Sequence, residues 1–322
     1  MNVPALSPDR IAALRRRFGA RIRENAPLAP YTSARIGGPA DFLLAVRTAA
    51  ELRLAAEELW ESQVPFRVLG GGSNILVSDA GVRCVVLLNQ AHTVRFSETQ
   101  TGFEGWAESG AGFGLLGRRA AERGLSGLEW AATIPGTVGG AVVGNAGAHG
   151  GEVAQALILA EILQPGGRLE RWSVDRMAYA YRDSWLKRNP GAAVVLTATF
   201  RLKRSTKDKV KTQMAEYQEY RQRTQPAGAS WGSMFKNPPS GHAGRLIDEA
   251  GLKGFQVGQA QVSSRHANFF INLGGATAAD VRALIEAVRA RVAERHNVAL
   301  ELEIELVGDW AGVLAEPGEG IH

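Results

Sequence analysis

The chain opens with apolar residues at helical spacing. Ile11, Leu14, Phe18 and Ile22 recur every three or four positions within residues 9–25, a period that places them on one face of an α-helix. We therefore expect an amphipathic N-terminal helix that packs as a lid on the rest of the molecule.

Beyond this helix the pattern changes to short apolar runs separated by helical stretches. Such runs predict strands, and their alternation with helices predicts units of mixed α and β structure. In the first unit the expected strands are 42–46, 66–69 and 82–88, with a helix at 49–61. In the second unit the expected strands are 105–109, 157–164, 168–173 and 193–202, with a helix at 115–123.

A polar, charged stretch at 206–224 has the composition of a helix and would bridge to a third unit. There the expected helices are 243–250 and 278–296, and the expected strands are 255–262, 268–272 and 299–307. The predicted fold class is α+β. We expect an N-terminal helix in 1–30, domains at 31–90, 91–204 and 205–308, and a loose tail at 309–322.

Composition narrows the class of protein. The chain has 322 residues, of which 45% are hydrophobic, which is enough apolar material for two or three domains around a ligand cleft. No apolar run approaches the roughly 20 residues that span a bilayer, and the N-terminus lacks the apolar core of a signal peptide. We expect a cytoplasmic protein without membrane insertion.

The distribution of charge and the spacing of cysteine and histidine bear on whether the protein binds nucleic acid or a metal ion. The net charge of +5 is spread thinly and lacks the interleaved aromatic residues of a nucleic-acid groove, so a small anionic ligand is expected instead. The single cysteine, Cys84, lies in an apolar run and is expected to pack inside a strand. The six histidines show no metal-ligand spacing, and we expect no metal site.

Two glycine-rich turns are the first candidates for chemistry. Glycine permits backbone conformations that a Cβ would forbid, and successive N–H groups can then face an anion. The first turn contains Gly70, Gly71, Gly72, Ser73 and Asn74, and the second contains Ile134, Pro135, Gly136, Thr137, Gly139 and Gly140. Either turn alone is equally compatible with a tight structural loop. Two turns in different units indicate a diphosphate gripped from both sides, as that of FAD would be.

A third glycine motif lies between them. Gly112, Gly114 and Gly117 fit the dinucleotide-binding pattern G-x-G-x-x-G after an expected strand and before an expected helix. The preceding strand is not a buried apolar run, however, and the chain lacks the regular βαβαβ series of that fold. We therefore interpret this motif as structural.

Three further segments carry candidate functional side chains. The segments are Tyr181-Arg182-Asp183-Ser184, the stretch 230–238 with Gly232-Ser233-Met234-Phe235-Lys236-Asn237-Pro238, and Leu302-Glu303-Ile304. Taken one at a time, the first is ordinarily interpreted as a surface arginine paired with its neighbouring aspartate, the second as a turn serine and the third as a solvated strand face. In the expected strand 299–307, Glu301, Glu303 and Glu305 alternate and would share one face.

Together with the glycine turns, these motifs resemble, from Tyr31 to Gly308, the UDP-N-acetylenolpyruvoylglucosamine reductases. Those enzymes are flavoproteins of bacterial cell-wall precursor synthesis. The resemblance implies a split FAD-binding fold of the vanillyl-alcohol oxidase (PCMH) type in two subdomains, plus a C-terminal α+β substrate-binding domain. It also implies FAD as cofactor, NADPH as hydride donor, and a monomer of the short family form without an inserted tyrosine loop.

The resemblance also implies a reaction, the reduction of UDP-N-acetylglucosamine enolpyruvate to UDP-N-acetylmuramate. Hydride addition to the enolpyruvyl double bond leaves a dianion, so the site needs groups that stabilise charge and an acid near the carbon. Arg182 and Glu303 would serve the first need and Ser233 would donate the proton. Both glycine turns and Arg221 would bind FAD, while Tyr181, Lys236 and Asn237 would bind the nucleotide sugar.

Three positions depart from the family pattern. Ala34 stands where many members have an aromatic residue, Trp231 where a small residue is common, and Leu302 where a proline is usual. Two other functions are compatible with the same motifs. One is an FAD-dependent oxidase of the same superfamily, and the other is a non-catalytic protein that binds a nucleotide sugar or flavin.

Overall fold

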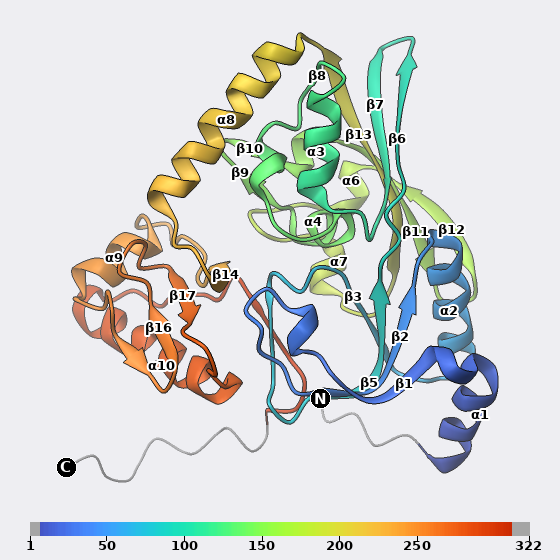
Figure 1. Cartoon of the computed structure of the whole chain (residues 1–322), viewed down its shortest axis with the longest axis horizontal. Helices are drawn as coiled ribbons and strands as arrows, with labels where there is room; N and C mark the ends of the chain where they lie inside the picture. The colour runs from blue at the N-terminus through green and yellow to red at the C-terminus, as the bar shows by residue number, and fades with distance from the viewer. Residues whose placement is uncertain (1–6, 311–322) are drawn as a thin grey trace.

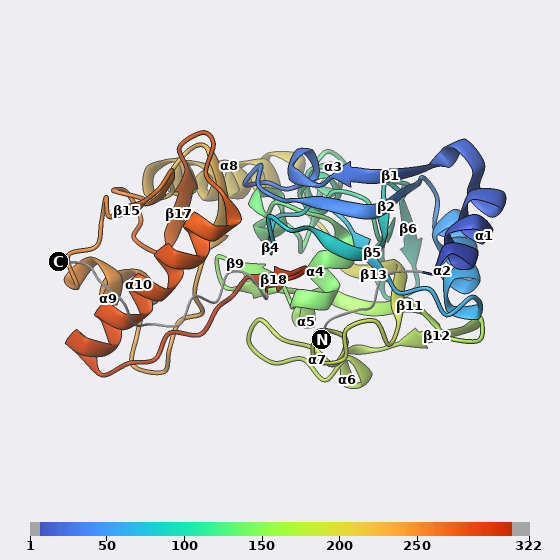
Figure 2. The same ribbon diagram turned by 90° about the horizontal axis from the view of Figure 1, so that it is seen from below.

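The computed structural model describes residues 7–310, which form two neighbouring sheet-containing units and a third unit beside them. A long helix, α8 (Lys207–Thr224), connects the second unit to the third (Figure 1). Figure 2 shows the third unit at one end of the molecule and the first helix, α1 (Pro8–Phe18), at the other. The predicted tail beyond residue 310 lies outside the described residues.

The first unit is built on a four-stranded sheet. Its strand order is β1 (Ile22–Pro27), β2 (Pro39–Val46), β5 (Val82–Asn89) and β3 (Phe66–Leu69), with α2 (Ala49–Glu61) packed against it. β1 runs antiparallel to β2, whereas β5 runs parallel to both β2 and β3. The predicted strands and helix of this unit are confirmed.

The N-terminal helix is shorter than predicted. α1 ends at Gly19, whose φ of +53° belongs to the left-handed region that favours glycine, and a short 3₁₀ turn then leads into β1. Ile22, expected on the helix, pairs with Leu44 in the sheet, yet it shares a core with Leu14. The helix lies beside α2, where Arg17 bonds Glu58 at 2.8 Å, far from the third unit (Figure 2). The expectation that it forms a lid is therefore wrong.

The second unit contains an antiparallel sheet. Its order is β12 (Arg168–Trp172), β11 (Leu157–Gln164), β13 (Val194–Arg204), β7 (Gly102–Glu108) and β6 (Val94–Thr99), and the short β8 (Leu125–Ser126) also pairs with β13. The helices of this unit are α3 (Phe113–Ala121), α4 (Val138–Gly144), α5 (Val153–Ala156), α6 (Val174–Met177) and α7 (Trp185–Arg188). Because the strand before the G-x-G-x-x-G motif belongs to an antiparallel sheet, the motif is not a Rossmann turn. A Cβ on Gly117 would lie 2.7 Å from the Leu128 carbonyl oxygen, so this glycine permits close helix packing.

The third unit combines a small sheet with two helices. The sheet order is β14 (Ala229–Ser233), β17 (Phe269–Asn272), β16 (Ala260–Val262) and β15 (Gln256–Val257), and the helices are α9 (Ala243–Glu249) and α10 (Ala278–His296). Its core includes Ala34, Ile36 and Leu76 from the first unit. Asp79, also of the first unit, accepts hydrogen bonds from Ala278 N and Ala279 N at 2.9 Å each. The third unit is therefore packed firmly on the first.

The last predicted strand is mostly absent. Only β18 (Glu305–Val307) is a strand, and it pairs in parallel with β4 (Ile75–Val77) of the first unit. The residues before it bond the loop after β14 through Lys236 N to the Glu301 carbonyl, Glu303 N to the Met234 carbonyl, and one isolated bridge between Phe235 and Leu302. The expectation of one continuous strand over 299–307 is wrong, because hydrogen bonding passes from the third unit to the first within this segment.

Two further searches bear on the protein's class. Within residues 7–310, none of the helices has both the length and the apolar character required to cross a bilayer. The same residues hold no group of three or more histidine, cysteine, aspartate or glutamate side chains arranged to bind a metal ion.

Candidate active site

The two glycine turns, far apart in the sequence, lie directly against each other. A Cβ on Gly71 would lie 2.9 Å from Gly136 Cα, and one on Gly70 would lie 2.3 Å from Thr137 Oγ1. A Cβ on Gly72 would lie 2.2 Å from the Tyr31 carbonyl oxygen. A side chain at Gly70 or Gly71 would force the two turns apart, and one at Gly72 would clash with the Tyr31 backbone, which is why glycine is needed here.

Backbone N–H groups at these turns are available to a ligand. The N–H groups of 70–74 and of Gly136 and Thr137 make no hydrogen bond to another residue within 7–310. A cavity of about 370 Å³ adjoins them, lined by Tyr31, Gly70, Gly71 and Thr137 among others. Unpaired N–H groups that converge from two glycine turns match the acceptor oxygens of a diphosphate, so these residues fit FAD.

Three of the residues assigned to the cofactor from the sequence also bond other parts of the protein. The Gly139 N–H donates to the Ser109 carbonyl at 2.7 Å, and a Cβ there would lie 3.0 Å from Ser109 Cβ. Asn74 donates through Nδ2 to the Glu303 carbonyl at 3.0 Å. Arg221, on α8, donates to the Thr133 carbonyl just before the second turn. These three residues therefore support the turns or join them to other parts of the site.

We predict that Gly71→Val yields folded protein without FAD. The new side chain would overlap Gly136 and separate the N–H groups that a diphosphate needs. Flavin absorbance per mole of purified protein measures the loss. Gly144→Val is the matched control, because a Cβ at Gly144 would meet nothing within 4 Å. Full flavin content in Gly71→Val would remove the first turn from the cofactor site.

Arg182 occupies a turn with an unusual backbone conformation. Its φ is +55°, and Ala180 and Asp183 exchange two backbone hydrogen bonds of 3.1 Å around it. A non-glycine residue held in this region costs roughly 1–3 kcal/mol. Asp183 pairs with Arg188 and not with Arg182, so the interpretation of Arg182 as a surface arginine paired with Asp183 is wrong.

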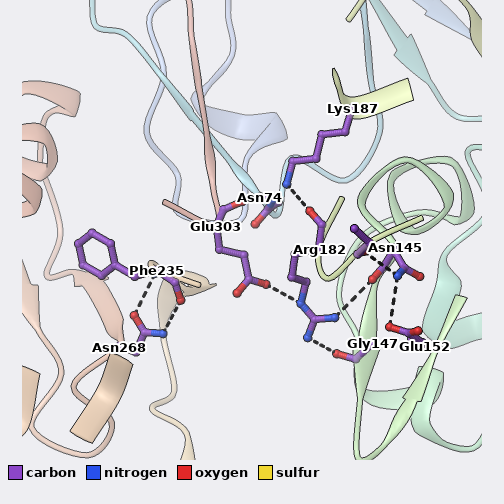
Figure 3. A network of polar contacts seen from close by, with 10 residues as sticks. Asn74, Asn145, Gly147, Glu152, Arg182, Lys187, Phe235, Asn268 and Glu303 are labelled. Atoms are coloured by element: carbon purple, nitrogen blue, oxygen red, sulfur yellow. Dashed lines mark hydrogen bonds and ion pairs between the residues drawn. The ribbon is translucent and has the colours of Figure 1, made fainter. Parts of the chain in front are cut away.

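The Arg182 guanidinium points into the molecule (Figure 3). It donates to the backbone oxygens of Asn145 at 3.3 Å and Gly147 at 2.6 Å, and its Nε donates to Glu303 Oε1 at 3.0 Å. Asn145 caps α4 in a left-handed conformation and is 1% exposed. Its side chain bonds Ala154 N and Ala180 O, which fixes the acceptors that Arg182 meets.

Glu303 is the carboxylate that meets Arg182. Its side chain is 18% exposed, and its backbone N–H donates to the Met234 carbonyl at 2.9 Å. Burial raises the pKa of Glu303 above its ordinary value, and the nearby cations Arg182, Lys187 and Lys236 partly oppose that rise. The site therefore holds a carboxylate that is more readily protonated than a surface glutamate.

The other two glutamates of the segment have different neighbours. Glu301 pairs with Lys236 and its side chain is 72% exposed, whereas Glu305 pairs with Arg67 at 2.5 Å. The prediction that all three share one strand face is wrong because the segment is not a continuous strand. Of these three glutamates, Glu303 is the one whose carboxylate pairs with Arg182.

Ser233 is the last residue of β14. The next residue, Met234, accepts the hydrogen bond from Glu303 N. Gly232 precedes Ser233 with a φ of +76°, and Met234 N donates to the Asn268 carbonyl at 2.7 Å. Asn268 is 2% exposed, and its side-chain amide bonds both Phe235 N at 2.9 Å and Phe235 O at 2.8 Å (Figure 3). These hydrogen bonds from Asn268 hold the loop that follows Ser233 beside the Glu303 segment.

The three residues predicted to bind substrate line one cavity. Tyr181, Lys236 and Asn237 surround a space of about 210 Å³ together with Glu301 and neighbouring prolines. The Arg182 guanidinium lies over the Tyr181 ring at 5.3 Å. The cavity is therefore adjacent to the Arg182–Glu303 ion pair.

Sequence reasoning missed three positions that order this site: Asn145, Asn268 and Lys187, whose ammonium donates to the Arg182 carbonyl at 2.9 Å. Lys187 lies five residues after Arg182, just beyond the 181–184 segment, and Asn145 lies five residues after Gly140 of the second glycine turn. Because Lys187 and Asn145 lie close in sequence to recognised motifs, that closeness could have identified them as candidate site residues. Asn268 gave no such signal beyond its place near an expected strand.

Comparisons with known proteins agree with this geometry. An FAD binding domain profile matches residues 40–173, and a profile for the C-terminal domain of UDP-N-acetylenolpyruvoylglucosamine reductase matches residues 223–307. The reductase of Rubrobacter xylanophilus is 46% identical over 286 residues, covering 88% of this chain and 94% of that protein. The reductase of Halalkalibacterium halodurans is 42% identical, covering 89% of this chain and 95% of that protein.

A solved structure supports the same relationship. The crystal structure of UDP-N-acetylenolpyruvylglucosamine reductase from Thermus caldophilus superposes with a TM-score of 0.75 at 41% identity, covering 88% of this chain and 99% of that one. The predicted split FAD-binding fold with a C-terminal α+β domain is confirmed. This chain belongs to the UDP-N-acetylenolpyruvoylglucosamine reductase family.

Proposed function

We propose that this protein uses NADPH and FAD to reduce UDP-N-acetylglucosamine enolpyruvate to UDP-N-acetylmuramate, a step of peptidoglycan precursor synthesis. The observation that carries this proposal is the largely buried Arg182–Glu303 ion pair, whose arginine lies over the ring of Tyr181, a residue that lines the cavity with Lys236. The Asn74 side chain joins the same carboxylate segment to the first glycine turn. Both glycine turns and all three catalytic candidates come from one chain, and we propose a monomer.

FAD, when bound, supplies the hydride that adds to the enolpyruvyl double bond. The protein must then stabilise negative charge that spreads onto the substrate carboxylate. Arg182 suits this role because a planar guanidinium can meet a carboxylate through two parallel hydrogen bonds. Three N–H groups of the Arg182 guanidinium bond Asn145, Gly147 and Glu303, which fixes the plane of the guanidinium. Its remaining N–H groups are left for the substrate carboxylate.

Glu303 has two properties that serve the same step. Its ion pair orients Arg182, and its raised pKa lets it accept a proton as negative charge accumulates nearby. A permanently charged carboxylate would repel the dianion, whereas a protonated one can donate a hydrogen bond to it. Ser233 then donates the proton to the carbon, since a carbanion next to a carboxylate is a stronger base than a serine alkoxide.

We predict that Glu303→Gln slows enolpyruvate reduction severely. Glutamine can still accept a hydrogen bond from Arg182, but it cannot form an ion pair with it or change its protonation as charge develops. Glu305→Gln is the matched control, because that carboxylate pairs with Arg67. Stopped-flow reoxidation of the reduced protein by substrate measures each rate. A large loss in Glu305→Gln with none in Glu303→Gln would remove Glu303 from the reaction.

The function itself is tested by product analysis. FAD-loaded protein, NADPH and UDP-N-acetylglucosamine enolpyruvate should yield UDP-N-acetylmuramate, identified by mass spectrometry, with equimolar loss of NADPH. An FAD-dependent oxidase would instead consume oxygen, and a binding protein would leave substrate and NADPH unchanged. Either result would refute the proposal.

A further inference from the structure

Lys187 is a charged side chain that the mechanism above does not use. It lies on α7, whose first residue follows the N-cap Ser184. The Ser184 hydroxyl accepts from Lys187 N at 3.1 Å and donates to the Val143 carbonyl of α4 at 2.6 Å. Because this cap fixes α7 on α4, the Lys187 side chain extends from a well-anchored backbone.

The ammonium of Lys187 folds back onto the turn that carries Arg182. It donates to the Arg182 carbonyl at 2.9 Å, and Figure 3 shows it approaching the backbone of Arg182 while the guanidinium points away toward Glu303. Arg182 is also the residue with the left-handed φ of +55°. A charge-assisted hydrogen bond is about twice as strong as a neutral one. Lys187 therefore restrains the backbone orientation from which the guanidinium projects.

The ammonium also lies among charges from every neighbouring segment. It interacts electrostatically with Asp183 of the turn, with Glu303 and Glu305 of the C-terminal segment, and with Lys236 of the loop after β14. Burial and the repulsion from Lys236 lower the pKa of Lys187, whereas the three carboxylates oppose that shift. Lys187 is in turn one of the cations that favour the ionised form of Glu303. It thus acts on both members of the Arg182–Glu303 pair.

We infer that Lys187 is a positioning residue for enolpyruvate reduction, which holds the Arg182 turn and supplies a further cation beside Glu303. This inference rests on the roles proposed for Arg182 and Glu303. A purely structural lysine would stabilise α7 alone, and its removal would lower the melting temperature without changing the rate or pH dependence of the reaction.

Three substitutions separate the hydrogen bond from the charge. In Lys187→Met both are lost, in Lys187→Gln a donor remains without charge, and in Lys187→Arg both remain. We expect Lys187→Met to slow reoxidation of the reduced protein by the enolpyruvyl substrate about 10- to 100-fold, the scale for a misplaced reacting group. Lys187→Gln should lie between Lys187→Met and the parent, and Lys187→Arg should recover most of the rate. FAD content and reduction by NADPH should match the parent throughout.

The pH dependence provides a readout that a structural role would not change. Removing a cation beside Glu303 raises the pKa of that carboxyl, so the corresponding limb of the pH–rate profile should move to higher pH in Lys187→Met and Lys187→Gln. It should stay in place in Lys187→Arg. Lys203→Met is the matched control, because Lys203 is an exposed lysine near the end of β13, on the same unit but not on the Arg182 turn. We expect this control to keep the parent rate and profile.

Each result bears on the inference. Parent rates and an unshifted profile in Lys187→Met would overturn it, and if that variant does not fold, equal rates and profiles in Lys187→Gln and Lys187→Arg would do so. A parent protein that substrate cannot reoxidise would refute the proposed function itself, and with it the positioning role.

Discussion

Replacing Ser233 by alanine is expected to stall the reaction after hydride delivery. The variant should bind FAD and substrate and be reduced by NADPH at nearly the parent rate, because within residues 7–310 the Ser233 hydroxyl makes no hydrogen bond to the glycine turns. Its reoxidation by the enolpyruvyl substrate should fall by about 10² to 10⁴, the usual cost of losing one positioned acid. Separate stopped-flow measurements of the two half-reactions check this.

Cysteine at the same position is the informative comparison. A thiol is a stronger acid of similar shape, so Ser233→Cys should lose much less activity than Ser233→Ala. Reoxidation of Ser233→Ala at the parent rate would show that water or another residue protonates the carbon. Ser233 would then be a turn residue that follows Gly232.

Arg182→Lys is expected to have the second large effect. Lysine keeps the positive charge but loses the planar fork, so it cannot hold Glu303, the backbone oxygens and a substrate carboxylate at once. We expect a loss of about 10² to 10³ in turnover, similar to removal of one preorganised donor in other enzymes. Reduction by NADPH should change little.

Arg67→Lys is the matched control for this substitution. Arg67 also pairs with a glutamate of the C-terminal segment, but that glutamate is Glu305, whereas Glu303 pairs with Arg182. It should keep nearly the parent rates in both half-reactions. If Arg182→Lys slows both half-reactions equally, Arg182 supports the fold or binds the nicotinamide, and its proposed role is wrong.

The parts of the fold that sequence predicted well are those with strong local periodicity. The expected helix at 278–296 coincides with α10, and the strand at 157–164 coincides with β11. Ile22 was misplaced because its spacing fits a helix, whereas its burial arises in the sheet core that it shares with Leu14. Periodicity reports that a residue is buried, and only long-range packing decides which element buries it.

The C-terminal segment shows a different limit. Alternating glutamates predict a strand face, but Leu302 bridges Phe235 of the third unit and Glu305 pairs with Ile75 of the first. The change of partner rotates the three carboxylates to different neighbours. Family resemblance selected Glu303, whereas strand periodicity could not distinguish it from the others.

The candidate site was predictable where a motif carries its own chemistry. The glycine turns were indicated in this way, whereas Arg182 was selected by the family resemblance. Side chains that return to the backbone of another segment, such as Asn268 on Phe235 and Lys187 on Arg182, leave no periodic signal. Their contribution appears only when the packed structure brings those backbone groups within reach.

The central claim is that this site reduces an enolpyruvyl ether with electrons held on FAD. The most direct test is to reduce the FAD-loaded parent protein with NADPH under argon and add UDP-N-acetylglucosamine enolpyruvate. We predict rapid return of the oxidised flavin spectrum together with stoichiometric UDP-N-acetylmuramate. Flavin that stays reduced until oxygen is admitted would contradict the account.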